Sequence, residues 1–320
     1  MKNGLIHSYV GFLDGLATRK PLFLFVALSR TFLAIGTLIT LVLSGPSILF
    51  DEPTFGKLSF NPTLEYFNIF TYFGFAHITV YYAVCIAVLL AVVSGFYPRL
   101  TGVLHWLVSF SLFRSAQILE GGDQITVIIT LLLIPVTLVD ARPNHWQLGR
   151  EYALGRANYF VANVSWAVIQ LQMGVLYLQA SVEKVYKLEE WKNGTAIYYF
   201  LNDPIFGYPA WMERLLASAL TNAYVVSGLT WGTILFEIIL AGAIFMRPKN
   251  RAKLLLPAVG FHLFIALAFG LVSFFFAMAG GLLVFLATKK TEAKLAQTLR
   301  RLVQRSGSTP AAVSPHMVAA

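Results

Sequence analysis

The sequence predicts an all-α protein, a polytopic transmembrane helical bundle of about eight spans, on three observations. Of its 320 residues, 57% are hydrophobic and only 12% are charged, whereas an ordinary soluble domain has roughly 25% charged residues. The mean hydropathy is +0.69, which is too high for a surface covered by water. The apolar residues fall in long runs between short polar segments. These features exclude a soluble globular enzyme, a disordered chain and a collagen-like fibre.

Eight apolar runs are long enough to cross a hydrocarbon core of roughly 30 Å, which takes about 17–25 helical residues. Gly270 divides the last two runs, which could also form one long broken helix. Before the first run, residues 4–16 have helical apolar spacing and predict an amphipathic helix in the plane of the membrane. The eight runs are residues 22–43, 74–95, 101–118, 124–139, 160–180, 224–246, 252–269 and 271–287.

The basic residues predict the orientation. With the amino terminus inside, 17 of the 24 Lys and Arg residues fall in inner segments and six in outer ones, while Arg30 lies within the first run. Because Lys and Arg accumulate on the cytoplasmic side, both termini are expected in the cytoplasm. We expect residues 1–290 to form one transmembrane domain, and residues 291–320 a basic and then disordered cytoplasmic tail.

Three ionisable residues lie at similar depth inside apolar runs: Arg30, Glu237 and His262. A charge near the bilayer centre costs on the order of 3 kcal/mol, so each of them needs a reason to be there. Equal depth predicts an Arg30–Glu237 ion pair with His262 as a third member. Such a cluster is either a structural ion pair or a proton or substrate site, in which Arg30 is a candidate substrate-binding residue, and the sequence leaves both open. His77 and His145 fall at run boundaries and are expected to be solvated.

The segment Glu120-Gly121-Gly122-Asp123-Gln124 places two carboxylates and two glycines at a membrane boundary. Glycine lets the backbone turn sharply and approach a partner closely. Glu120, Asp123 and Gln124 are therefore candidate substrate-binding residues, and a tight turn with solvated acids is the alternative.

Lys184 follows the fifth run, beside Glu183 and at the predicted outer interface. A partly desolvated lysine gives up its proton more readily and can act as a base, whereas a snorkelling interfacial lysine is the commoner case. Aromatic residues follow closely, and Trp191, Tyr198 and Tyr199 are candidates for substrate binding. Lys184, Glu237 and His262 are the candidate catalytic residues.

Several other kinds of site find no support in the sequence. It has no HxxxH or HExxH motif and no dense Cys/His/Asp cluster, so no metal site is predicted. The basic residues lie in short loops rather than along one face, which argues against nucleic-acid binding. The lipid bilayer is the predicted surrounding.

Four motifs closely resemble the SdpB family of bacterial integral membrane proteins: PRLTGVLHW (98–106), EGGDQI (120–125), PVTLVDARPNHW (135–146) and EWKNGTAIYYFLNDPIFGYP (190–209). The family belongs to systems that produce an exported peptide toxin. The resemblance implies a protein of the bacterial cytoplasmic membrane that acts with a small SdpA-like partner. Its substrate would be an SdpC-like toxin precursor, matured at the outer face.

The chain is also distantly similar to the HTTM group, the membrane domain of vitamin K-dependent γ-carboxylases. Arg30 on the first run, ASVEKV (180–185) and Phe261-His262 resemble that group's motifs, and Lys184 falls at the position of its catalytic lysine. This similarity implies the fold and a membrane quinol as cofactor. The carboxylases carry a basic pair where this chain has Glu183-Lys184, so carboxylation is not implied.

Three functions remain open from the sequence. The first is a maturation factor acting on a secreted precursor. The second is a quinol-dependent, carboxylase-like enzyme that modifies a peptide or small substrate. The third is a non-enzymatic chaperone or immunity protein that binds the toxin.

Overall fold

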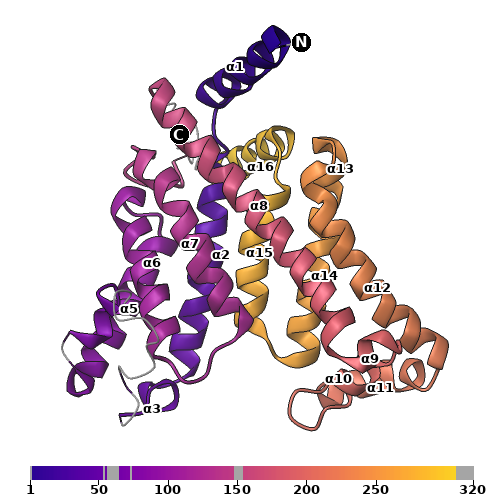
Figure 1. Ribbon diagram of the computed structural model, residues 1–320. Coiled ribbons are helices and arrows are strands. Elements are labelled where there is room, and N and C mark those ends of the chain that lie inside the picture. The colour runs from indigo at the N-terminus through magenta and orange to yellow at the C-terminus, as the bar shows by residue number, and fades with distance from the viewer. Residues whose placement is uncertain (1, 53–54, 56–64, 73, 148–153, 308–320) are drawn as a thin grey trace, which may run out of the picture.

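The computed structural model describes residues 2–52, 55, 65–72, 74–147 and 154–307. Within these ranges the chain is helical, and the β-structure is limited to one isolated bridge between Phe96 and Asn144. Eight long helices lie side by side in Figure 1 and coincide with the eight predicted runs. They are α2 (Phe23–Leu43), α5 (Ile78–Val93), α6 (Pro98–Ser115), α7 (Gly121–Val139), α8 (Arg156–Lys187), α12 (Ala223–Ala241), α14 (Leu255–Phe269) and α15 (Val272–Leu286).

Six helical segments are long and apolar enough to cross a membrane, and the number becomes seven if α15 and α16 form one bent span. These numbers are lower than the predicted eight. The α6 helix carries Arg99, His105 and Arg114, which lower its hydropathy. The α15 helix has only 15 residues, which at 1.5 Å each reach about 22 Å. The chain is thus a multi-pass membrane protein in which two of the bundled helices are less apolar or shorter than ordinary spans.

Further helices cover the two ends of the bundle. At one end lie α1 (Lys2–Thr18), α13 (Pro248–Lys253) and α16 (Lys289–Gly307) (Figure 1). At the other lie α3 (Pro46–Leu49), α9 (Glu189–Lys192), α10 (Ala196–Leu201) and α11 (Ala210–Leu220), while the 3-10 turns η1 (Ile69–Thr71), η2 (Phe75–His77) and η3 (Gly242–Phe245) adjoin longer helices. The α1 helix confirms the helix predicted over residues 4–16. The basic part of the predicted tail forms α16, and residues 308–320 lie outside the described part of the chain.

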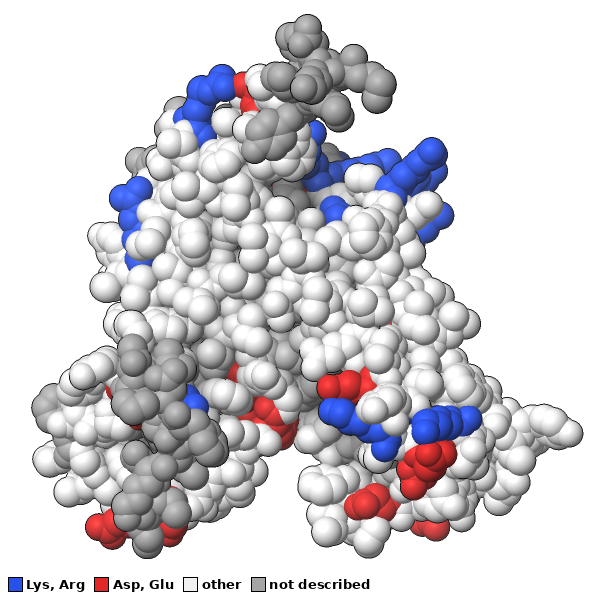
Figure 2. Space-filling view, viewed as in Figure 1, with Lys and Arg blue, Asp and Glu red and all other residues white. Residues whose placement is uncertain are grey.

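Charge separates the two ends. In Figure 2 a wide band without charged residues divides a basic end, where α1, α13 and α16 lie, from an end where the acidic residues gather. We call these the basic end and the acidic end. The band has the character of a hydrocarbon-facing surface, and the basic end holds the loops that the positive-inside rule assigns to the cytoplasm.

The α2 and α15 helices pack closely at the centre of the bundle. A Cβ atom on Gly280 would lie 2.9 Å from Leu33 Cγ and 3.1 Å from the Ser29 carbonyl oxygen, so only glycine fits this contact. Small residues allow helix backbones in membranes to approach each other and gain dispersion contacts. This contact fixes the position of α15 against α2. It therefore also fixes the position of the residues that connect α15 to α16.

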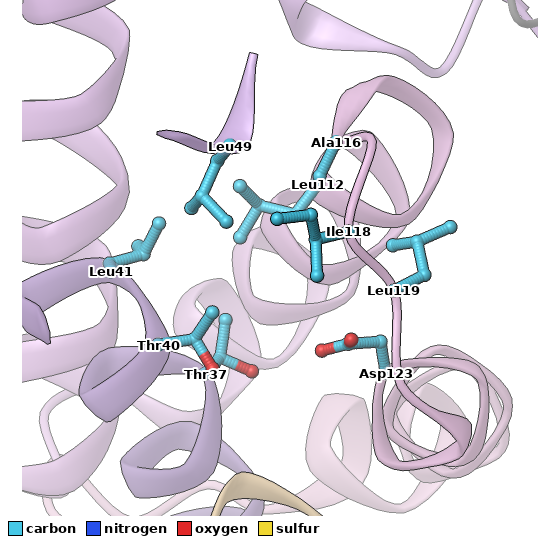
Figure 3. A pocket seen from close by; sticks show the side chains of 9 residues that line it. All are labelled: Thr37, Thr40, Leu41, Leu49, Leu112, Ala116, Ile118, Leu119 and Asp123. Atoms are coloured by element: carbon cyan, nitrogen blue, oxygen red, sulfur yellow. The ribbon is translucent and has the colours of Figure 1, made fainter. Parts of the chain in front are cut away.

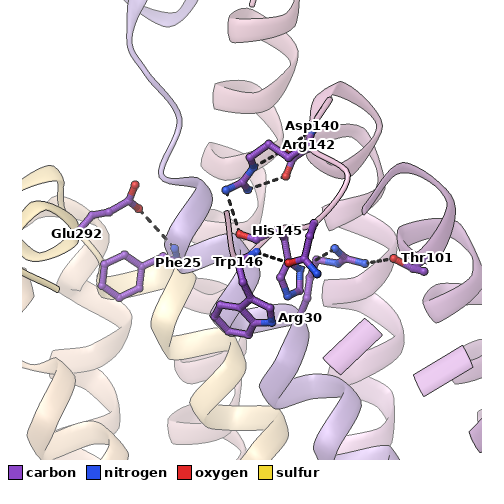
Figure 4. A network of polar contacts seen from close by, with 9 residues as sticks. Phe25, Arg30, Thr101, Asp140, Arg142, His145, Trp146 and Glu292 are labelled. Atoms are coloured by element: carbon purple, nitrogen blue, oxygen red, sulfur yellow. Dashed lines mark hydrogen bonds and ion pairs between the residues drawn. The ribbon is translucent and has the colours of Figure 1, made fainter. Parts of the chain in front are cut away.

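The α16 helix is tied to the start of α2. Leu22, the residue before α2, offers no side-chain cap, and a carboxylate oxygen of Glu292 instead accepts a hydrogen bond from the Phe25 N–H at 3.4 Å (Figure 4). Helix N-termini have unpaired N–H groups and favour negative charge. Burial nevertheless raises the pKa of Glu292 to about 7.

We expect single cysteines at the two ends to react with a membrane-impermeant maleimide from opposite sides. The native Cys85 is buried and gives little background. Ile205 (80% exposed) lies at the acidic end, and Leu302 (56% exposed) lies on α16. In intact cells, Ile205→Cys should react at once and Leu302→Cys only after permeabilisation. The reverse pattern would contradict the orientation.

Candidate functional site

The candidate site centres on an ion pair between α8 and α12. The Nζ atom of Lys184 lies 2.7 Å from both carboxylate oxygens of Glu237. Only 8% of the Glu237 side chain is exposed, against 23% for Lys184. The pair therefore links the last turns of α8 to the last third of α12, with its acid inside the bundle and its amine near the acidic end.

Trp191 covers the amine of this pair. Its ring centroid lies 5.4 Å from Lys184 Nζ, within the range of a cation–π contact, and the ring also packs against Phe200 at 5.9 Å. The backbone reaches this position through Gly194, whose φ of +74° suits glycine and whose Cβ would lie 2.5 Å from Ser227 Oγ. The sequence thus folds α9 and α10 over α12 and excludes part of the solvent from Lys184.

Two more buried polar rings lie next to the pair. Tyr177 stands seven residues before Lys184, on the same face of α8; it is 1% exposed, and its hydroxyl has no hydrogen-bond partner in the described part of the chain. His262 on α14 places its ring centroid 6.1 Å from that of Tyr177. Its Nδ1 lies 2.9 Å from the Ala258 carbonyl oxygen and donates to it. His262 therefore borders the site through Tyr177, and within the described part of the chain it forms no hydrogen bond or ion pair with Lys184 or Glu237.

Glu183 takes no part in this cluster. It accepts from Lys187 at 2.9 Å and from Gln179 at 3.2 Å, both on the solvent side of α8. Neighbouring helix residues point about 100° apart, and the structure separates Glu183 and Lys184 accordingly. The only carboxylate bonded to Lys184 among the described residues is Glu237.

The predicted Arg30–Glu237 pair is wrong. Arg30 donates from Nη2 to Thr101 Oγ1 at 2.8 Å, and its Nη1 lies 3.1 Å from His145 Nδ1 (Figure 4). Equal depth along the bilayer normal did not make Arg30 and Glu237 neighbours, because α2 packs against α15 and α5 whereas α12 packs against α8. Arg30 therefore belongs to a separate polar network.

This second network includes a loop that folds back into the bundle. His145 was expected to be solvated but is buried, and its backbone N–H donates to the Gly95 carbonyl oxygen at 2.9 Å. Arg142 donates to the His145 carbonyl oxygen and pairs with Asp140 at 2.7 Å. Burial, and then the charges of Arg30 and Arg142, lower the pKa of His145 to about 3. A neutral ring can accept from Arg30, so this network is a structural brace for α2.

Glu120 and Asp123 form a reciprocal cap at the start of α7. The Asp123 carboxylate accepts from the Glu120 N–H at 2.9 Å, which is the geometry of a capping box, and Glu120 also accepts from Ser273 Oγ at 2.8 Å. Figure 3 shows Asp123 facing Thr37 and Thr40 across a small cavity of about 20 Å³, enough for one water molecule. Gln124 is exposed. The structure brings none of these three residues into the Lys184 cluster, and their substrate-binding role stays a prediction.

The remaining predicted residues lie on α10. Tyr198 and Tyr199 are exposed to solvent, and they follow in the chain after Trp191, the residue whose ring covers Lys184. Sequence reasoning missed Tyr177, Thr101 and His145. Tyr177 could have been found from its seven-residue spacing to Lys184, whereas nothing in the local sequence indicates the partners of Arg30.

We expect Lys184→Ala or Glu237→Ala to lower the free energy of unfolding by about 3 kcal/mol, because each leaves a partner charge buried and unpaired. The double change Lys184→Met with Glu237→Leu should cost much less than the sum. Unfolding of the purified chain in detergent measures these effects. Lys187→Ala is the matched control: it breaks a solvent-exposed pair and should leave the free energy of unfolding nearly unchanged. Additive losses at Lys184 and Glu237 would contradict the pairing.

We also expect a pH-dependent contribution from His145. The unfolded side chain binds a proton near pH 6.5, whereas the folded one stays neutral down to about pH 3. The contribution of His145 to the free energy of unfolding is therefore complete above pH 6.5. Below that pH it declines by about 1.4 kcal/mol per pH unit. Between pH 6.5 and 5 the stability advantage of the native chain over His145→Gln should shrink by about 2 kcal/mol. A constant difference across this range would refute a buried neutral His145.

Two curated proteins are similar to this chain over most of its length. The uncharacterized protein YitO of Bacillus subtilis (strain 168) is 35% identical over 273 residues, which is 84% of this chain and 86% of YitO. The sporulation-delaying protein SdpB of the same organism is 33% identical over 287 residues, which is 88% of this chain and 86% of SdpB. No family model matches, and no solved structure matches significantly. The extent and identity of these alignments show that the chain belongs to the SdpB family.

Proposed function

We propose that this protein is an integral factor of the bacterial cytoplasmic membrane required for maturation of an exported peptide toxin. It acts on an SdpC-like precursor at the outer face, together with a small SdpA-like protein. Membership of the SdpB family supports the toxin system. The observation that carries the proposal is the buried Lys184–Glu237 pair beneath Trp191, at the end of the bundle opposite the basic end.

The pair can hold its proton in two ways. In one form the amine is an ammonium and Glu237 a carboxylate; in the other, the proton lies on Glu237 and Lys184 is a neutral amine. Because Nζ contacts both oxygens at 2.7 Å, the proton passes between them without movement of either helix. The neutral amine is the form that acts as a general base on a bound precursor. Glu237 then holds the proton that Lys184 has given up. His262 and Tyr177 are the buried side chains that pack next to it.

The precursor reaches the Lys184 amine over the aromatic side chains of α9 and α10. Tyr198 and Tyr199 are exposed on α10 and lie in the segment that continues from Trp191, so a peptide bound over them passes next to the cover of Lys184. Glu120 and Asp123 begin α7 and line the same end of the bundle, where they offer carboxylates to basic groups of the precursor. Arg30 is committed to Thr101 and His145, so its part is to position helices.

A membrane quinol, which the distant HTTM similarity implies, receives no support from the described cavities. The cavity of about 20 Å³ beside Asp123 is too small for a quinone ring, and the larger groove lies at the basic end. Neither is lined by Lys184, Glu237 or His262. The proposed chemistry therefore uses no step on a quinol.

One observation favours a second function, that of a non-enzymatic toxin binder. Lys184 is already fully paired, and the exposed aromatic side chains Tyr199, Phe206 and Trp211 lie at the same end of the bundle. A chaperone or immunity protein would use this surface and leave the precursor chemically unchanged. The mass of the precursor separates the two functions, since a binder alters its yield and an enzyme alters its mass.

We expect Lys184→Ala and Lys184→Arg to abolish a discrete mass change in the precursor alike, by at least about 100-fold in rate. Arginine keeps the charge and the contact with Glu237 but cannot give up its proton near neutral pH, so the Lys184→Arg chain should fold normally. Mass spectrometry of the precursor from cells that produce each variant measures the change. Lys187→Arg, one turn further along α8, is the control and should be fully active. Full activity of Lys184→Arg would show that Lys184 is only a charge contact.

A further inference from the structure

A large groove opens at the basic end, away from the Lys184 cluster. It has a volume of about 910 Å³ and lies between α1, α8, α13 and the junction of α15 with α16. Eight cationic side chains line it, among them Lys249, Arg251 and Lys253 of α13 and Lys289, Lys290 and Lys294 of α16. Among the lining residues that the structure describes, none is Asp or Glu. The basic surface over α13 and α16 is visible at the upper right of Figure 2.

Part of the groove lining is apolar. Phe12 and Leu16 of α1, together with Leu22 and Trp166, provide this part, next to Arg19 and Lys20. It is held in place, because the Asn163 amide on α8 donates to the carbonyl oxygens of Leu16 at 2.9 Å and Arg19 at 2.8 Å. A ligand that matches both the cationic and the apolar lining has an anionic head and an apolar tail.

Arg251 provides a preformed anchor for the head. One of its terminal nitrogens donates to the Ala287 carbonyl oxygen at 3.3 Å, which fixes the guanidinium at the end of α15. Its Nε is buried and has no hydrogen-bond partner in the described part of the chain. A buried, unsatisfied donor on a charged group is costly, and an anionic oxygen bound in the groove removes that cost.

The depth of the groove matches a lipid headgroup. It is bordered by Leu22, directly before α2, and by Ala287, directly after α15, which mark the edge of the apolar bundle. Basic pockets between membrane helices on the cytoplasmic side bind anionic lipid headgroups. We propose that this groove binds one anionic phospholipid, with its phosphate among the α13 and α16 cations and an acyl chain against Phe12, Leu16 and Trp166. This site is independent of the proposed function.

Lipid binding to the full chain in detergent, counted by native mass spectrometry, tests the proposal. The probes are phosphatidylglycerol and phosphatidylcholine with the same acyl chains. The groove variant carries Lys249→Gln, Lys253→Gln and Lys294→Gln, all at exposed positions. The control variant carries Arg99→Gln, Arg247→Gln and Arg300→Gln, which remove the same charge from exposed residues outside the groove lining.

We expect one phosphatidylglycerol to bind in preference to phosphatidylcholine. The groove variant should lose on the order of 100-fold in affinity for it, and the control variant should keep the native affinity. Equal losses in both variants would overturn the proposal in favour of general surface attraction. Displacement of the lipid by inorganic phosphate would overturn the tail contact, and tighter binding of an acidic peptide would identify the groove as a peptide site.

A second measurement locates the tail. Phosphatidylglycerol with brominated acyl chains quenches tryptophan fluorescence on contact, and Trp166 lines the groove. Quenching by the bound lipid should disappear in Trp166→Phe and persist in Trp211→Phe, whose ring lies on α11 at the acidic end. Equal quenching in both variants would place the acyl chain outside the groove and overturn the proposal.

Discussion

A charge inside an apolar bundle must have a partner, and this constraint decides how the helices of this protein are joined. Lys184 and Glu237 connect α8 to α12 through two contacts of 2.7 Å. Arg30 connects α2 to Thr101 of α6 and to the loop that carries His145. Leaving any of these groups unpaired costs several kcal/mol, far more than a misplaced apolar contact. The polar contacts therefore select one arrangement among the many that apolar packing alone would permit.

The two ends of the bundle are suited to different chemistry. At the acidic end, the short helices α9 and α10 cover the amine of Lys184, whose partner, the Glu237 carboxylate, is buried. In such an environment a proton can pass between the amine and the carboxylate. At the basic end, α1, α13 and α16 surround a groove that is lined by both cationic and apolar residues. The close α2–α15 contact at Gly280 holds these ends in fixed relation. The proposed peptide chemistry and the proposed lipid contact thus lie toward opposite ends of the bundle.

The candidate site was predicted in part from local sequence. Lys184 was singled out because it ends an apolar run beside aromatic residues, and the structure places Trp191 over it as that pattern suggests. Glu237 was singled out because of its depth, but it was assigned to Arg30. Depth can be counted in residues along one helix, whereas the partner of a side chain depends on which helices are neighbours and how each is rotated. Glu120 and Asp123 were found from their position at a boundary, and the structure shows that they cap α7.

The sequence by itself determined the class of the protein, the approximate position of its long helices and the basic character of one end, because hydropathy and charge are properties of continuous segments. Tertiary structure alone decided that Lys184 pairs with Glu237, that Arg30 contacts His145 in a loop 115 residues away, and that Tyr177 and His262 share one wall. It also decided that α1, α13 and α16 meet around one groove. These contacts join residues that lie far apart in the chain, and only the packing and rotation of whole helices brings such residues together.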